Sequence, residues 1–83
     1  MSKTIKVYGT RWCGDSKRAL RILDQRNVKY DWIDVDKDKD GENFVKETNQ
    51  GCRSVPTIIF PDESILVEPS NQQLEDKLNS MSL

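Results

Sequence analysis

The chain has 83 residues, 13 basic and 14 acidic side chains, two cysteines and no histidine. This length fits a single domain, residues 1–83, and the charge balance excludes the basic surface that a nucleic acid or a membrane would need, so we expect neither as a partner. The lack of histidine removes Cys-His dyads, Ser-His-Asp triads and most zinc sites, and we expect no metal site.

The first half of the chain predicts a βαβ unit. Residues 5–9 alternate in polarity and end in a glycine, which is typical of a short strand. After a loop at 10–14, apolar side chains recur on one face of a helix that runs from residue 15 to about Asn27. Residues 30–35 are rich in β-branched and aromatic side chains and predict a second strand, parallel to the first if the helix is a crossover.

The second half predicts a helix, a hairpin and a last helix. Acidic residues at 38–42 favour a helix start, because negative charge is stabilising there. The apolar segments 55–60 and 65–67 flank a short turn and predict a β-hairpin. Ser70 or Asn71 caps the last helix. The order βαβαββα predicts an α/β fold with a four-stranded mixed sheet flanked by helices.

Cys13 is the residue best placed for chemistry. It lies after the first strand and directly before the first helix, where unpaired N–H groups and the positive end of the helix dipole favour a thiolate. Arg11, Lys17 and Arg18 are nearby cations, and Asp15 opposes them. A thiolate in this position can attack a disulfide. The alternative is an inert cysteine that packs the start of the helix.

The two neighbours of Cys13 suit a reactive thiol. Trp12 can cover the sulfur and offer an apolar face to a substrate that carries a disulfide. Gly14 leaves the sulfur unobstructed. Both residues are therefore predicted substrate contacts.

Three features together resemble the glutaredoxin branch of the thioredoxin superfamily. They are the segment Trp12-Cys13-Gly14-Asp15-Ser16, the element Ser54-Val55-Pro56 and the βαβαββα order. Residues 49–57 and the short hairpin after them look closest to mycoredoxin-type small glutaredoxins. The resemblance covers nearly the whole chain and implies a thioredoxin fold, with Cys13 as the catalytic nucleophile and Pro56 as a cis-proline beside it.

The resemblance also implies how a thiol substrate binds. The backbone of Val55 would pair with it like a strand, and the start of the last helix would hold a cofactor carboxylate. With the neighbours of Cys13, the predicted thiol-substrate-binding residues are Arg11, Trp12, Gly14, Val55, Pro56, Ser70 and Asn71. Residues 67–71 lack the Gly-Gly of glutathione-binding members, so glutathione, mycothiol, another small thiol and a thioredoxin-reductase-like flavoenzyme all stay open as reductants. No cofactor is expected to be tightly bound.

Ser16 stands where dithiol members of the family have a resolving cysteine, and a serine hydroxyl cannot expel a thiol from a mixed disulfide. We therefore expect a monothiol oxidoreductase that reduces thiolated or disulfide-containing proteins through Cys13, in electron transport and cell redox homeostasis. An engineered Cys-to-Ser change would give the same sequence. The alternative function is an iron-sulfur cluster carrier of the monothiol glutaredoxin type. The short segment before Cys13 and the charge of Asp15 count against that alternative.

Two further patterns have competing interpretations. Cys52 precedes the Ser-Val-Pro element and either resolves Cys13, carries a glutathione itself or is a tolerated loop cysteine. The acidic segment 36–41, with Glu47, matches the calcium-loop pattern of an EF-hand. A predicted strand precedes it where an EF-hand has a helix, so we interpret the segment as a solvated loop that starts the second helix.

The compartment follows from what the sequence lacks. No apolar run approaches a membrane-spanning helix, and the N-terminal residues do not form the apolar core of a secretory signal. Two cysteines are too few for a secreted disulfide scaffold. We expect a cytoplasmic monomer.

Overall fold

The predicted order of elements is confirmed. The computed structural model describes residues 4–83, and the first three residues of the predicted domain lie outside the described residues. The elements are β1 (Ile5–Gly9), α1 (Gly14–Gln25), β2 (Tyr30–Asp34), α2 (Lys39–Thr48), β3 (Thr57–Ile59), β4 (Ile65–Val67) and α3 (Asn71–Ser80). Within this described part of the chain, the strands form one four-stranded mixed sheet in the order β2-β1-β3-β4.

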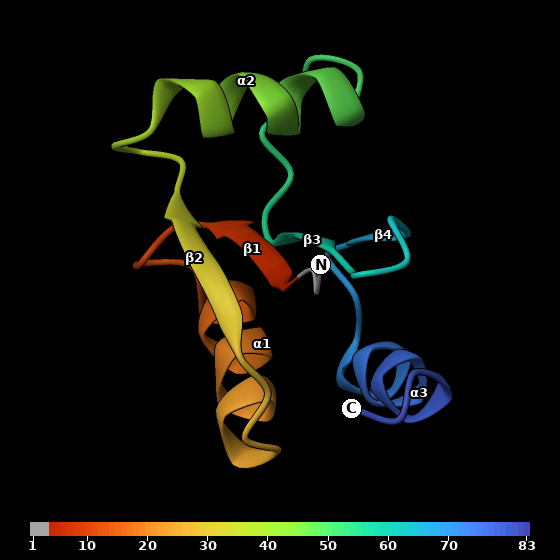
Figure 1. The fold of residues 1–83 in the computed structure, drawn as a ribbon. Helices are drawn as coiled ribbons and strands as arrows, with labels where there is room; N and C mark the ends of the chain where they lie inside the picture. The colour runs from red at the N-terminus through yellow and green to blue at the C-terminus, as the bar shows by residue number, and fades with distance from the viewer. Residues whose placement is uncertain (1–3) are drawn as a thin grey trace.

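Strand β1 lies in the middle of the sheet, parallel to β2 and antiparallel to β3. Val7 at its centre is opposite Trp32 on one side and Ile58 on the other. Figure 1 shows α1 and α3 on one face of the sheet and α2 on the other. Helix α1 is thus the crossover that joins two parallel strands, as predicted.

Side chains alternate between the two faces of the sheet, as the pleat of a strand requires. The face toward α1 and α3 carries the main hydrophobic core, whose buried members are Ile5, Val7, Ala19, Ile22, Leu23, Ile58, Phe60, Leu74 and Leu78. On the opposite face, the Tyr8 ring lies against the Phe44 ring of α2, with centroids 4.7 Å apart. The sheet is therefore covered on both faces, and the loops at the ends of its strands are left to carry chemistry.

Local capping explains where the helices begin and end. The Asp38 side chain accepts a hydrogen bond from the Gly41 N–H and caps α2, which confirms that the acidic segment starts this helix. The chain is helical from Lys39, within the segment that would have to form the calcium-binding loop of an EF-hand. The segment therefore does not have the conformation of such a loop. Asn27 adopts a φ of 57° just after α1, the left-handed conformation in which asparagine often ends a helix.

Strand β3 is shorter than the predicted strand over residues 55–60. Pro56 has no N–H to donate to a sheet, and it lies before the strand with a cis peptide bond to Val55. At the other end, the Phe60 N–H donates to the Ser64 carbonyl, so the chain is already turning into the hairpin. The strand is therefore limited to the three residues between these two features.

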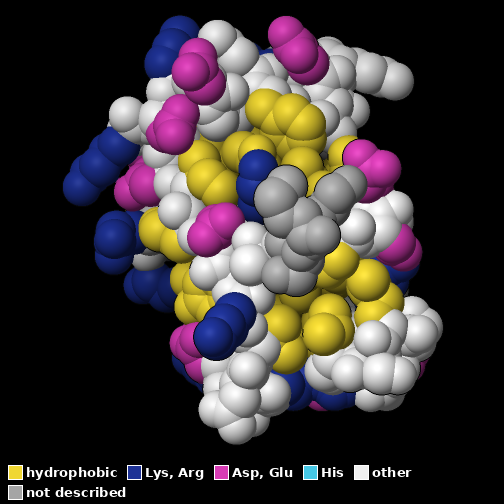
Figure 2. Space-filling model, viewed as in Figure 1, with side chains coloured by type: hydrophobic (Ala, Val, Ile, Leu, Met, Phe, Trp, Pro, Cys, Tyr) yellow, Lys and Arg dark blue, Asp and Glu magenta, His cyan; other side chains and the backbone are white. Residues whose placement is uncertain are grey.

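The surface carries charges of both signs. Figure 2 shows basic and acidic side chains mixed along the edge beside β2 and the turn into α2, with hydrophobic side chains gathered beneath α2 and again near α3. Among residues 4–83, no helix is long and apolar enough to cross a membrane.

Candidate functional site

Cys13 is the N-cap residue of α1. Its backbone is extended, and its carbonyl accepts the first intrahelical bond, from the Lys17 N–H at 3.1 Å. The first N–H groups of a helix have no acceptor within the helix, so the half-buried thiol lies at an electropositive end. The structure thus places the predicted nucleophile at the helix start that the sequence indicated.

The loop before β3 brings a second segment to the thiol. The Cys13 Sγ lies 4.0 Å from the carbonyl oxygen of Val55, a weak contact for a sulfur donor. Val55 is half-buried, and Pro56 after it is buried. Residues 42 positions apart in the sequence therefore face each other across the sulfur.

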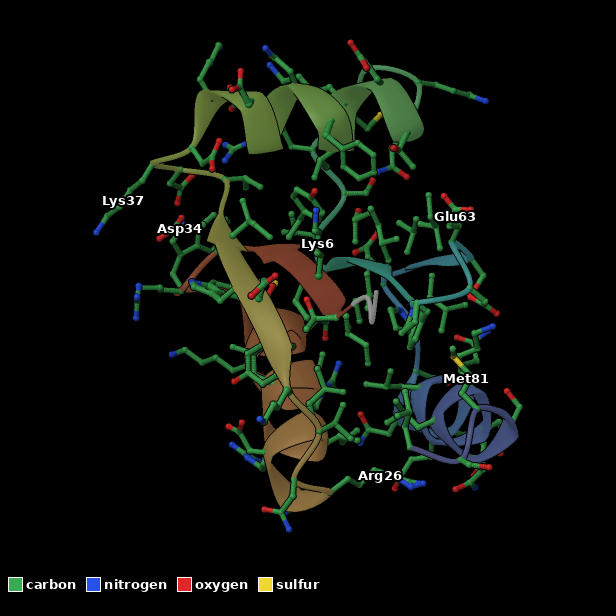
Figure 3. All side chains as sticks on the ribbon, in the orientation of Figure 1. Lys6, Arg26, Asp34, Lys37, Glu63 and Met81 are labelled. Carbon is green, nitrogen blue, oxygen red and sulfur yellow. The ribbon has the colours of Figure 1, made fainter. Side chains whose placement is uncertain are left out.

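Trp12, immediately before Cys13, is tied to the turn after β2. Its indole N–H donates to an Asp36 carboxylate oxygen at 2.8 Å, while the residue stays 71% exposed. The other oxygen of Asp36 accepts from the Arg53 guanidinium at 2.5 Å. Figure 3 labels Asp34 and Lys37, which flank this turn at the end of β2.

Arg53 is held by a second carboxylate as well. Its Nε lies 3.1 Å from Glu42 of α2. Hydrogen bonds from Arg53 and then from Trp12 lower the pKa of Asp36 below its usual range, and a hydrogen bond from Lys39 is the main cause of a lowered pKa at Glu42. Both acids are thus held in the charged form that binds Arg53.

Two of the three cations expected around the thiol, Arg11 and Arg18, have carboxylate partners of their own. Arg18 bonds to Asp15 one turn along α1, and the Arg11 Nε lies 3.7 Å from Asp34. These are surface pairs, which contribute little to stability. Their charge is partly neutralised, so these two cations favour a thiolate at Cys13 less than free cations would.

The predicted positions 14 and 16 differ sharply in their surroundings. Gly14 is the first residue of α1, and nothing lies within 4 Å of the place a β-carbon would take. Ser16 is fully buried, and its hydroxyl has no hydrogen-bond partner in the described structure. The access that Gly14 was predicted to leave is therefore present, while the hydroxyl at position 16 is out of reach of solvent.

The segment that leads into α3 is hydrogen-bonded to Pro56. The Glu68 N–H donates to the Pro56 carbonyl at 2.8 Å, which anchors the segment that leads into the helix. Ser70 is the N-cap: its hydroxyl accepts from the Gln73 N–H, and the Gln73 side chain accepts from the Ser70 N–H. Asn71 is the first helical residue. The capping box occupies two of the N–H groups that the sequence offered for a carboxylate ligand.

Cys52 is exposed in the turn after α2, and both cysteines are free thiols.

The contacts of Asp36 were not predicted from the sequence, which indicates only a solvated loop at this position. One clue was available, because Cys13 follows β1 and Asp36 follows β2, and the carboxyl ends of parallel strands meet at one edge of a sheet. Residues 4–83 contain no cluster of three His, Cys, Asp or Glu side chains that could hold a metal ion.

Comparisons with known proteins show the family and the fold. The family model for glutaredoxin matches residues 5–65. Mycoredoxin 1 of Corynebacterium glutamicum is 32% identical over 78 residues, which cover 94% of this chain and 96% of that protein. The crystal structure of the thioredoxin-like protein BC3987 superimposes with a TM-score of 0.76 at 25% identity, covering 88% of this chain and 97% of the other. A glutaredoxin from Archaeoglobus fulgidus shares the fold, with a TM-score of 0.71 at 22% identity over 92% of this chain and 85% of its own.

Proposed function

Since this chain belongs to the glutaredoxin family, we propose that it is a thiol-disulfide oxidoreductase that reduces mixed disulfides through Cys13. The observation that supports the proposal is the position of the thiol. Cys13 is half-buried at the N-cap of α1, with its sulfur 4.0 Å from the Val55 carbonyl on the facing loop. A helix start favours the thiolate, and the facing backbone offers a bound substrate hydrogen-bonding groups.

The reaction has two exchanges. The Cys13 thiolate attacks one sulfur of a mixed disulfide, a new S–S bond forms, the old one breaks, and the target protein leaves as a thiolate that takes a proton from water. A second small thiol, as its thiolate, then attacks the small-thiol sulfur held on Cys13: a disulfide between the two small thiols forms, the bond to Cys13 breaks, and Cys13 leaves as the free thiolate. Over the two exchanges, the disulfide bond moves from the target protein to the pair of small thiols, so no other oxidant or reductant is needed.

The second exchange needs an external thiol. The Ser16 hydroxyl cannot form a disulfide and so cannot act as a resolving nucleophile, which makes the chain a monothiol enzyme in this proposal. We propose a low-molecular-weight thiol, glutathione or mycothiol, as co-substrate, or a thioredoxin-reductase-like flavoenzyme as the reductant. The targets are thiolated or disulfide-containing proteins, met by a monomer in the cytoplasm, where thiols are kept reduced.

Turnover of two mixed disulfides tests the proposal: a small one between glutathione and mercaptoethanol, and serum albumin carrying glutathione on its cysteine. Each is assayed with glutathione, mycothiol or a thioredoxin reductase. We expect Cys13→Ser to abolish turnover and Cys52→Ser, the matched change at the exposed cysteine, to retain it. Turnover that survives Cys13→Ser would refute the proposal.

The same preparation tests the iron-sulfur alternative. A cluster carrier of the monothiol type would be purified brown, with visible charge-transfer absorbance that disappears in Cys13→Ser. An oxidoreductase alone gives a colourless protein that turns over mixed disulfides.

A further inference from the structure

Asp36 joins the two segments that face each other across the reactive sulfur. Its two carboxylate oxygens bind different partners: one accepts from the Trp12 indole at 2.8 Å, the other from the Arg53 guanidinium at 2.5 Å. Trp12 is the residue before Cys13, and Arg53 is two residues before Val55. Asp36 therefore links the segment that carries Cys13 to the segment that carries Val55, in addition to the pairing of β1 with β3.

The other groups of the cluster hold Asp36 in place. Arg53 also bonds Glu42 of α2 at 3.1 Å, so the loop before Val55 is tied both to the turn after β2 and to a helix. The side chains of Asp36 and Arg53 are each 38% exposed, so this pair alone would contribute little. The cluster is therefore a polar bridge over three loop and helix segments rather than a single surface ion pair.

Trp12 combines a hydrogen-bonded indole N–H with an unusual exposure. Trp12 is 71% exposed although it is the largest apolar side chain beside the thiol. Its one polar atom is satisfied by Asp36, so the ring is held in one orientation while its face stays open to solvent. A fixed, exposed tryptophan is typical of a binding hot spot, because little conformational entropy is lost when a partner covers it.

We propose that Asp36 is a positioning residue that holds Trp12 as a docking surface for protein substrates next to Cys13. The partner is a protein that carries its mixed disulfide beside an apolar side chain, which covers the indole while the disulfide reaches the sulfur. The inference rests on the proposed function and deepens it, since it assigns the substrate preference to protein disulfides over small ones.

The test compares KM and kcat for glutathione-carrying serum albumin and for the small glutathione–mercaptoethanol disulfide. Asp36→Ala removes both hydrogen bonds, and Trp12→Phe keeps a ring but removes the indole N–H. We expect each variant to raise KM for the protein substrate about 5- to 20-fold and to raise KM for the small disulfide by a clearly smaller factor, with kcat for the protein substrate changed less than twofold. The double variant should be no worse than the worse single variant, because both remove the same hydrogen bond.

A spectroscopic arm separates positioning from general damage. The indole N–H proton of Trp12, assigned by its loss in Trp12→Phe, should shift upfield and exchange faster with water in Asp36→Ala, and Asp36→Glu should restore part of both the shift and KM. Asp40→Ala, which removes another exposed carboxylate near the start of α2, is the matched charge control and should leave KM unchanged.

The outcomes are distinguishable. If the wild type turns over the albumin substrate but Asp36→Ala leaves KM within twofold, or the two single variants are additive, the inference about Asp36 is wrong and the proposed function stands. If both substrates lose activity equally, Asp36 acts on the thiol and not on Trp12. A wild-type chain that turns over neither disulfide overturns both proposals.

Discussion

The hydroxyl oxygen of Ser16 lies 2.6 Å from the point where a β-carbon on Gly9 would stand, and a ring carbon of Trp32 lies 2.9 Å from the same point. No real β-carbon tolerates such contacts, and Ser16 is fully buried, so it has little room to move away. We expect Gly9→Ala to lower the free energy of unfolding by about 1–3 kcal/mol, the usual cost of overpacking a core. Urea denaturation measures this loss.

Gly14→Ala is the matched control for that experiment. Position 14 has open space where a β-carbon would be and lies in the first turn of α1, where alanine is a better helix residue than glycine. We expect its unfolding free energy to stay within about 0.5 kcal/mol of wild type or to rise. Equal losses in Gly9→Ala and Gly14→Ala would show that the close approach of Ser16 has no energetic weight.

Ser16→Cys should convert the monothiol site into a dithiol one. The new thiol would lie three positions after Cys13 at the start of the same helix, and it could expel the target or the small thiol as an intramolecular disulfide forms. We expect one turnover of glutathione-carrying albumin without added thiol, with the disulfide seen by mass spectrometry. Ser16→Ala, which also removes the unpartnered hydroxyl, should form no such disulfide. A Ser16→Cys protein that stays glutathionylated at Cys13 and forms no intramolecular disulfide would contradict the prediction.

Ser70→Ala separates a structural role from a binding role at the start of α3. The Ser70 hydroxyl caps the helix by accepting from the Gln73 N–H at 3.1 Å. Its loss should lower the free energy of unfolding by about 0.5–2 kcal/mol, measured by thermal or urea denaturation. At temperatures where the variant is still folded, we expect KM for the glutathione–mercaptoethanol disulfide to change less than twofold. A large rise in KM with unchanged stability would instead make Ser70 a substrate contact.

Acid should weaken the fold partly through Asp62. The Ser64 hydroxyl donates to this carboxylate at 2.5 Å, and Lys77 of α3 donates to its other oxygen at 2.9 Å. These bonds, the Ser64 hydroxyl first, hold the pKa of Asp62 far below its ordinary range. A carboxylate whose pKa is lowered in the folded state stabilises the fold above its unfolded pKa of about 4, and this contribution is lost as the pH falls toward the folded value.

The measurement is unfolding free energy against pH for wild type and Asp62→Asn. The variant should be less stable at pH 6 and should approach wild type as the pH falls below about 4. Asp40→Asn, another exposed acid, controls for the change in net charge. A gap between Asp62→Asn and wild type that stays constant down to the lowest pH would refute this account.

Much of the fold could be predicted because its elements are specified locally. The periodicity of α1, the acidic start of α2 and the capping box of α3 are all written within a few neighbouring residues, and all three helices are confirmed. Strand β3 was predicted too long, since hydrophobicity at Val55 and Phe60 does not reveal which backbone groups reach a neighbouring strand. That choice depends on Pro56 and on the hydrogen bond from Phe60 to Ser64.

The only part of the site that could be predicted from the residues themselves is the part that depends on a single position in the chain. A cysteine at a helix start is visible in the sequence, and Cys13 is where it was expected. The contact with Val55 came from family resemblance, because it joins segments 42 positions apart. The bridge through Asp36 was missed, since its partners lie 24 residues before it and 17 after it, a distance at which a pattern of neighbouring residues says nothing.

The strand order also fixes when the site becomes complete during synthesis. A chain leaving the ribosome releases β1, Cys13, α1 and β2 first, while β3, the second neighbour of β1, begins only at Thr57. A nascent chain that ends before this point has the thiol but lacks β3, Phe60 and the helix α3 that close the main core. Its central strand has one open edge, and no β3 fixes the Val55 carbonyl opposite the cysteine. The last third of the protein therefore closes the sheet and the core beside a cysteine whose helix has already been made.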